Sequence, residues 1–161
     1  MRTVIASGGF DPLHSGHIDY FNEAAKLGER LWVALNSDEW LTRKKGQPFM
    51  CYAERLKIIS NLRMVDRVIP VVNDHKVDNS SGAILWAQQC GAKDIVFVNG
   101  GDRTDMNSPE EDFYQHDTGV RFVYGVGGET KKNSSRWLLQ DWSSPKTERE
   151  WGYYRVLKDY G

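Results

Sequence analysis

Two histidines three positions apart, His14 and His17, are the residues of this chain best suited to chemistry. They stand at the predicted start of a helix, where side chains at this spacing project to the same side. Gly16, which has no side chain, leaves room for another group between them. Two imidazoles beside one phosphate can donate hydrogen bonds to charge that develops in a transition state. The spacing also suits a structural pair or a shared metal ion, and by itself leaves all three roles open.

The loop that leads to these histidines begins with a glycine pair, Gly8 and Gly9, and continues through Phe10 and Asp11. Glycines let a backbone approach a ligand closely, and a helix amino terminus offers free N–H groups to phosphate. The loop has neither the GxxxxGKS/T pattern of a Walker loop nor the GxGxxG pattern of a dinucleotide fold. We therefore expect a phosphate site of another kind.

Basic residues further along the chain also suit phosphate. Lys44 and Lys45 belong to a run of positive charge, which by itself is more often a solvated loop. Arg63 stands near the end of a predicted helix. Its planar guanidinium can hold two phosphate oxygens, or it can satisfy the last carbonyls of the helix.

Two later segments offer further groups to a ligand. The turn Gly100-Gly101-Asp102 follows a predicted strand, and there the glycines permit close approach while the aspartate can accept from a sugar hydroxyl. A plain turn is the alternative. Ser134 and Ser135 precede the last predicted helix, so they are expected to cap it and to offer hydroxyl and N–H groups to phosphate.

Strands and helices must position these groups. Buried strands are predicted by five short apolar runs, at residues 3–6, 30–35, 67–72, 94–98 and 120–124. Helices are predicted by apolar spacing, at residues 18–27, 53–62 and 83–90, with another beginning at Ser108. The first of these is expected to close on a left-handed Gly28, and the helix at 83–90 to end at Gly91.

The alternation of strands and helices predicts an α/β fold. We expect a Rossmann-like doubly wound parallel sheet of about five strands with helices on both faces. Such a sheet binds ligands beyond the carboxyl ends of its strands. The loops after Ala6, Leu35, Val98 and Tyr124 are therefore expected to form the site.

Composition limits the classes of protein that fit. The 161 residues suit one compact domain, expected over 1–142, with a carboxyl-terminal extension over 143–161 for packing or subunit contact. The net charge of −1 favours neither a nucleic acid nor a membrane partner. Two cysteines without CxxC spacing, and no apolar run near the ~20 residues of a membrane span, lead us to expect a cytoplasmic protein without disulfides.

The segment GGFDPLHSGH resembles the HxGH signature of the cytidylyltransferase-like nucleotidyltransferase superfamily, in the same place between the first strand and first helix. Residues 36–39 are similar to the family's (N/S)(S/T)DE segment, and residues 43–48 to its basic KG(P) loop. The segment from Ala53 to Val68 is similar to its ER helix and the strand that follows. The resemblance covers roughly residues 3–139.

The resemblance implies a set of site residues. Catalytic roles are implied for four of them, His14, His17, Lys45 and Arg63, with Lys44 as the alternative to Lys45. Nucleotide binding is implied for ten positions, namely Gly8, Gly9, Phe10, Asp11, Lys44, Gly100, Gly101, Asp102, Ser134 and Ser135.

The match is weaker before the last helix, where the family has an RTxGxSTT-like motif. Glu129 falls near the place of its arginine, and Arg136 replaces its second threonine. The missing positive charge is expected to come from Lys131, Lys132 or Arg136.

The implied reaction is an in-line displacement without a covalent intermediate, in which a phosphate of the acceptor attacks a nucleoside triphosphate and pyrophosphate leaves. Mg²⁺ is expected with the triphosphate, with Asp11 as a water-mediated neighbour, and no set of residues is predicted to hold a metal alone. The partners are then a nucleoside triphosphate and a small phosphorylated molecule, and the resemblance implies a homodimer.

The substrates are less closely fixed. CTP with an acceptor such as glycerol-3-phosphate is favoured by a small margin. The turn at residues 100–102 also resembles that of heptose-phosphate adenylyltransferases, so transfer from ATP to a sugar phosphate is the alternative. A second alternative is a nucleotide sensor without catalysis, because a fold does not fix a function.

Overall fold

A parallel sheet of five strands forms the centre of the molecule in the computed structural model. The strands follow the order β3-β2-β1-β4-β5, and every neighbouring pair is parallel. Their bounds are β1 (Arg2–Gly8), β2 (Arg30–Leu35), β3 (Arg67–Pro70), β4 (Asp94–Gly100) and β5 (Val120–Val126). The structure describes residues 1–71, 80–100, 109–114, 116–128 and 134–143.

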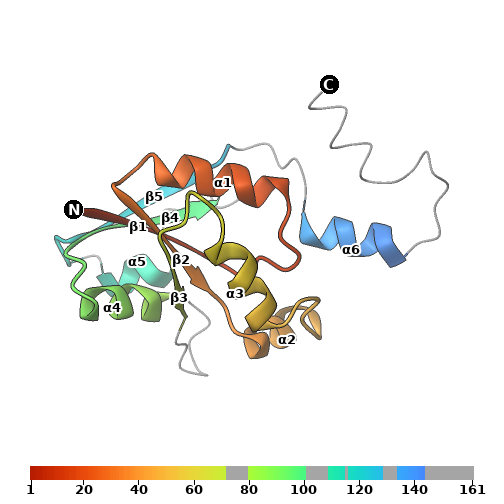
Figure 1. Ribbon diagram of the computed structural model, residues 1–161. Coiled ribbons are helices and arrows are strands. Elements are labelled where there is room, and N and C mark those ends of the chain that lie inside the picture. Colours follow the sequence, from red (N-terminus) through yellow and green to blue (C-terminus); the bar gives the residue numbers. More distant parts are fainter. Residues whose placement is uncertain (72–79, 101–108, 115, 129–133, 144–161) are drawn as a thin grey trace.

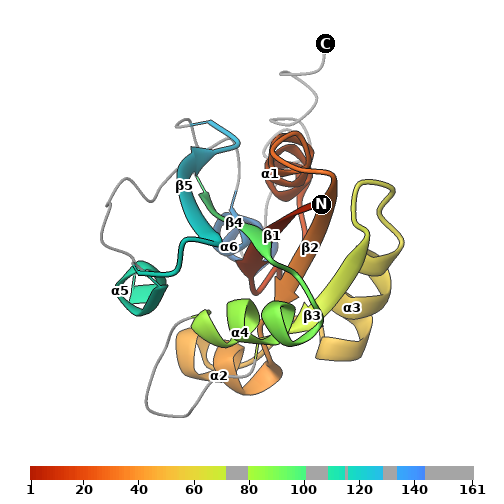
Figure 2. The same cartoon turned by 90° about the vertical axis from the view of Figure 1, so that its left-hand side faces the viewer.

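Helices cover both faces of this sheet (Figure 1). One face carries α1 (Ser15–Ala25) and α3 (Tyr52–Ser60), and the other carries α4 (Ser81–Gln89) and α5 (Pro109–Tyr114). Figure 2, which views the molecule from the side, shows the same two layers. The predicted Rossmann-like α/β architecture is therefore confirmed.

The core is divided by the sheet because side chains alternate along each strand. Val4 and Ala6 of β1 pack in the cluster with α1 and α3, whereas Ile5 between them packs with α4. Both faces of β1, β2 and β4 are thus buried, which explains why these strands read as continuous apolar runs.

The order of the strands reverses between β1 and β4, and this places the site. Ligands of such sheets bind where the order reverses, beyond the carboxyl ends of the strands. The helix α6 (Ser135–Ser143) lies beyond these ends in Figure 1. The hydroxyl of Tyr20 donates to the carbonyl of Val98 at 2.9 Å, so α1 is tied to the end of β4.

The structure contains a helix, α2 (Asp38–Lys45), that the sequence did not predict. Residues expected as the basic loop form part of it. Ser37 caps this helix by accepting from the N–H of Trp40 at 3.1 Å, and Gly46 closes it at a φ of 92°. Of its residues only Leu41 is buried, so the apolar periodicity that reveals a helix is missing.

The role predicted for Gly28 is wrong. The helix α1 ends at Ala25, and Gly28 is not among the residues with positive φ. A Cβ there would lie 2.9 Å from the carbonyl oxygen of Arg2 and 2.8 Å from Val4, so this glycine permits close packing. Gly91, at a φ of 90°, does have the left-handed conformation after α4.

The expected extension at residues 143–161 begins at the last residue of α6, and the remainder of it lies outside the described residues. No described helix is both long and apolar enough to cross a membrane.

Candidate active site

The two histidines lie together at the start of α1. His14 is the N-cap of the helix and His17 is its third residue. Their rings stack with centroids 3.7 Å apart and an angle of 25° between the planes. A Cβ on Gly16 would lie 2.9 Å from the His14 ring, so the room that Gly16 leaves is taken by that imidazole.

Backbone hydrogen bonds orient both rings. The Nδ1 atom of His14 accepts from the N–H of Gly16 at 3.1 Å, and that of His17 accepts from the N–H of His14 at 3.2 Å. A neutral imidazole that accepts at Nδ1 carries its proton on Nε2. The proton of the neutral His17 ring is therefore on Nε2, from which it can be donated to a ligand.

The surroundings of His17 keep it neutral. Burial, and secondly the neighbouring His14, lower the pKa of His17 from 6.5 to about 3. The rings of Phe10 and His17 pack edge to face, with their centroids 5.1 Å apart and their planes at 89°. At neutral pH this side chain is thus a fixed hydrogen-bond donor without charge.

The glycine pair serves packing around this ring. A Cβ on Gly8 would lie 2.9 Å from the ring of Phe10, and one on Gly9 would lie 2.8 Å from Leu41. Phe10 is itself buried and has a φ of 49°, a left-handed conformation that is uncommon outside glycine. The loop is therefore held in one shape by its contacts.

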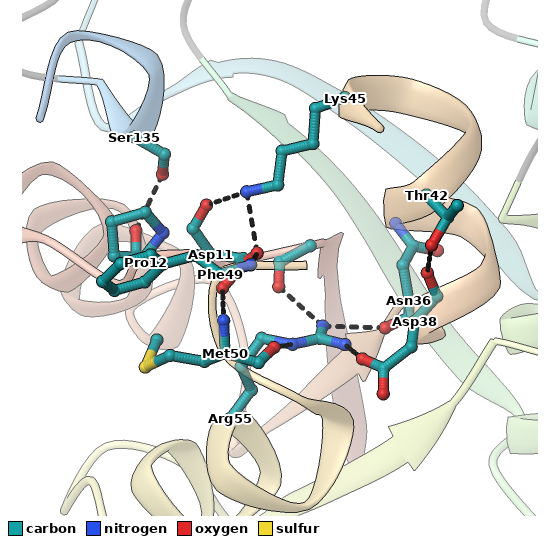
Figure 3. Close-up of polar contacts among 11 residues, drawn as sticks. Asp11, Pro12, Asn36, Asp38, Thr42, Lys45, Phe49, Met50, Arg55 and Ser135 are labelled. Carbon is teal, nitrogen blue, oxygen red and sulfur yellow. Dashed lines mark hydrogen bonds and ion pairs between the residues drawn. The ribbon is translucent and has the colours of Figure 1, made fainter. Parts of the chain in front are cut away.

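Asp11 ties the histidine loop to the segment after α2 (Figure 3). Its carboxylate, 1% exposed, accepts from the N–H groups of Phe49 and Met50 at 2.6 Å each. The ammonium of Lys45 lies 2.7 Å from the same carboxylate and donates to the Asp11 carbonyl at 2.6 Å. Lys45, which was expected to meet phosphate, thus lies in the site with its ammonium beside Asp11.

Arg55 of α3 is fully buried and links three segments of the site (Figure 3). It donates to the carbonyls of Gly9 and Asn36 at 2.8 Å each. It also donates to the carbonyl of Met50 at 2.9 Å and to the carboxylate of Asp38 at 2.7 Å. The loops after β1, β2 and α2 are therefore held against one guanidinium.

Sequence reasoning did not assign a role to Arg55. The signal was present in the resemblance of residues 53–55 to the ER helix of the family, but an arginine within a helix is ordinarily exposed. Its four acceptors come from residues far apart in the chain or from backbone carbonyls, which a sequence pattern does not reveal.

A cleft of about 990 Å³ opens between α2, the segment after it and α6. Its basic lining comprises Lys44, Lys45 and Arg136. The ammonium of Lys44 also lies 5.5 Å from the centre of the Trp40 ring. This concentration of positive charge beside the histidine loop suits a phosphate-rich ligand.

The two serines have separate roles at the start of α6. The Ser134 hydroxyl accepts from the N–H of Trp137 at 3.1 Å and so caps the helix, as predicted. The Ser135 hydroxyl donates to the carbonyl of Pro12 at 2.7 Å, and this residue lines the cleft. The first turn of α6 is thus fastened to the histidine loop.

Arg63 is not brought to this site. It follows α3, in the turn that leads into β3, and three residues later Asp66 accepts from the N–H of Leu31 at the start of β2. That is the amino edge of the sheet, opposite the histidines, because α3 runs back across the sheet. The placement gives no support to a phosphate contact by Arg63 within this chain.

The remaining predicted positions are only partly described. Gly100 is the last residue of β4, at the carboxyl edge where a nucleotide site is expected. Gly101 and Asp102 lie outside the described residues, as do Glu129, Lys131 and Lys132. Of the three candidates for the missing positive charge, Arg136 is described, and it lines the cleft.

The residues present fit a magnesium ion that arrives with a triphosphate. Both oxygens of Asp11 already accept hydrogen bonds, and the described residues contain no group of three or more histidine, cysteine or acidic side chains that could hold a metal. An ion bound here would take most of its ligands from phosphate oxygens and water, which is usual for Mg²⁺.

The fold and this site define a class of protein in which a parallel α/β sheet carries a histidine pair at its switch point. A cytidylyltransferase-like family model matches residues 5–127. The chain belongs to this family, as its motifs indicated, and it is a nucleotidyltransferase.

Similar proteins come from several organisms. Bifunctional protein HldE of Hydrogenovibrio crunogenus is 35% identical over 150 residues, which are 92% of this chain and 26% of that protein. HldE of Vibrio cholerae is 36% identical over 132 residues, or 81% of this chain and 24% of that protein. The chain thus spans about a quarter of the length of these relatives.

A solved structure resembles the chain over most of both lengths. It is a lipopolysaccharide core biosynthesis protein from Thermoplasma volcanium GSS1, with a TM-score of 0.60 and 30% identity. The match covers 77% of this chain and 95% of the other.

Replacing His17 by alanine is expected to lower kcat by about a hundredfold or more, roughly 3 kcal/mol, because one donor to the transition state is lost. Steady-state release of pyrophosphate measures this. His116→Ala, at an exposed position outside the site, is the control. An unchanged rate for a pure, folded His17→Ala protein would contradict the role of the pair.

The low pKa of His17 predicts how stability depends on pH. The unfolded chain binds a proton at this residue below pH 6.5, whereas the folded protein does so only near 3. The free energy of unfolding is therefore expected to fall as the pH drops through that window. Urea unfolding of the wild type and of His17→Gln across it should show a weaker dependence in the variant, and parallel curves would refute the assignment.

Arg55→Ala is expected to reduce the free energy of unfolding by about 3–5 kcal/mol, since it leaves the Asp38 carboxylate and three carbonyls without their donor. Chemical denaturation measures this loss. Lys57→Ala, an exposed position on the same helix, is expected to change stability little. Equal effects of the two substitutions would show that the buried contacts of Arg55 are unimportant.

Proposed function

We propose that this nucleotidyltransferase takes ATP as its donor and transfers AMP to the phosphate of a sugar phosphate. The observation that carries the proposal is the similarity to a lipopolysaccharide core biosynthesis protein, of which the chain covers 95% at 30% identity. A lipopolysaccharide core is built from sugars, so a sugar phosphate is the acceptor that this likeness favours over glycerol-3-phosphate.

Further support comes from the relatives and from one turn. The relatives named HldE match most of this chain, and the chain spans a quarter of each. The sequence Gly100-Gly101-Asp102 resembles that of heptose-phosphate adenylyltransferases. These likenesses favour ATP and a sugar phosphate, the alternative that sequence reasoning ranked second, over CTP.

The site suits the chemistry of this reaction. An oxygen of the acceptor phosphate would attack the α-phosphorus of ATP, while the bond from that phosphorus to the bridging oxygen breaks and pyrophosphate leaves with the electron pair. The Nε2–H groups of His14 and His17 would donate to the α-phosphate oxygens as charge develops. Mg²⁺ would neutralise part of the triphosphate charge.

The basic residues of the cleft have a complementary role in the proposal. Lys44, Lys45 and Arg136 would hold the phosphates that enter or leave the cleft. Phosphoryl-type transfer depends mainly on alignment and on neutralising spread charge, so a rigid loop beside a basic cleft provides what it needs.

The test is a substrate panel with the purified protein and Mg²⁺. ATP and CTP are each paired with heptose 1-phosphate, other sugar 1-phosphates, glycerol-3-phosphate and phosphoethanolamine, and pyrophosphate release and product mass are measured. We expect the highest kcat/KM for ATP with a sugar phosphate. Preference for CTP with glycerol-3-phosphate would restore the other assignment, and nucleotide binding without turnover would indicate a sensor.

A further inference from the structure

Three buried side-chain atoms in the described part of the chain lack a hydrogen-bond partner: Asn36 Oδ1, Asn99 Nδ2 and Glu110 Oε2. Burying a polar atom without a partner costs about 1–3 kcal/mol, and most buried polar atoms are paired. Asn36 is 3% exposed and Asn99 is 5% exposed. Two such amides at one edge of a sheet therefore require an explanation.

Glu110 has a structural role that explains its burial. Its other carboxylate oxygen accepts from the N–H of Ser80 at 2.7 Å, directly before α4. A carboxylate is stabilised at the amino terminus of a helix by the helix dipole. The two asparagines have no comparable partner for the atoms in question, and both are at the carboxyl ends of strands.

Both asparagines lie on the face of the sheet that carries α4. Along β2, Trp32 and Ala34 pack in the α4 cluster, and Asn36 continues this alternation one residue after the strand. Along β4, Ile95 and Phe97 pack in the same cluster, and Asn99 follows.

The extra residue of the β4–β5 irregularity belongs to β5, since two steps from Val98 to Gly100 face three steps from Val123 to Val126. The alternation of side chains along β4 is therefore unbroken up to Asn99.

The register of the strands sets the size of the missing partner. β1 lies between β2 and β4, so the two asparagines are two strand spacings apart across the sheet, about 10 Å. Asn99 is level with Ser7 and Ala34. Asn36 lies two residues further along than Ala34, so the Cα atoms of the two asparagines are about 12 Å apart. Ser7 of β1, two residues after the α4-facing Ile5, lies between them on the same face. A single sugar ring with a hydroxyl at each end spans such a gap with one hydrogen bond on either side.

The chemistry of the two atoms also points to hydroxyl groups. Asn36 Oδ1 can only accept and Asn99 Nδ2 can only donate. A phosphate oxygen suits the donor but not the acceptor, whereas a hydroxyl group both donates and accepts. The backbone that carries Asn36 Oδ1 is fixed on both sides. Its N–H donates to the Gly8 carbonyl at 3.0 Å, and its carbonyl accepts from Arg55 at 2.8 Å.

We propose that Asn36 and Asn99 bind hydroxyl groups on the sugar part of the acceptor and so select a polyhydroxylated substrate. This inference rests on the proposed transfer to a sugar phosphate. The sugar would lie on the α4 face of β1, while the histidines come from α1 on the opposite face. The α-phosphate would then lie between the acceptor and the imidazoles, above the end of β1.

The experiment measures kcat and KM for Asn36→Ala and Asn99→Ala with Mg²⁺, ATP and the sugar phosphate that the wild type uses best. Each substitution is expected to lower kcat/KM for the sugar phosphate roughly ten- to hundredfold, because a buried substrate hydroxyl loses its partner. The KM for ATP is expected to stay within about twofold. Asn22→Ala, at an exposed position of α1, is the matched control.

Three kinetic results would contradict the inference, and each has a different meaning. A wild type that turns over no sugar phosphate removes the proposed function and this inference with it. An active wild type whose two variants keep the acceptor kcat/KM refutes the inference alone. A rise in the KM for ATP with an unchanged acceptor KM assigns the asparagines to the nucleotide and also refutes it.

A stability measurement separates substrate binding from a structural role. Asn99→Leu replaces an amide whose Nδ2 is buried without a partner by an apolar side chain of similar size, so the melting temperature is expected to stay within about 4 °C of the wild type or to rise. Loss of acceptor kcat/KM in this stable variant supports the inference. A large fall in melting temperature would show that the amide serves the fold, and would overturn it.

Discussion

The site depends on a single buried cation. Arg55 has four acceptors, which lie in the loops after β1, β2 and α2 and at the first residue of α2. A buried guanidinium is costly unless its donors are satisfied, so the arrangement that satisfies it is strongly preferred over others. The folded protein can satisfy Arg55 only when these loops have this shape.

The rest of the site follows from this constraint. Gly9, whose carbonyl Arg55 holds, stands next to Phe10, and Phe10 supports the ring of His17. Asp11 then fastens Lys45 and the segment after α2 to the same loop. The histidine pair is therefore in place before a ligand binds, as expected of groups that stabilise a transition state through preorganisation.

Much of this arrangement could be predicted from the sequence. The apolar strands and the glycine-bounded helix before Gly91 gave the fold correctly, because burial on both faces leaves a strong pattern. The histidine pair was found because its spacing and its place between the first strand and first helix are both visible in the chain. Ser134 was recognised as a cap because it lies where the family has a motif before its last helix.

Other features had no signal of their own. The helix α2 buries only Leu41, so its pattern is polar, and its capping residues were the sole indication. Arg63 and Arg55 look alike in sequence, and only the direction of α3 separates an arginine at the site from one at the far edge of the sheet. The unpaired atoms Asn36 Oδ1 and Asn99 Nδ2 depend on contacts among three strands, which no local pattern shows.

The central claim is that the two imidazoles at the start of α1 meet the phosphorus under attack. A crystal structure with Mg²⁺ and a non-hydrolysable analogue of ATP tests it directly. The account predicts the Nε2 atoms of His14 and His17 at about 2.7–3.2 Å from α-phosphate oxygens. An α-phosphate bound elsewhere, or imidazoles turned away from it, would contradict the account.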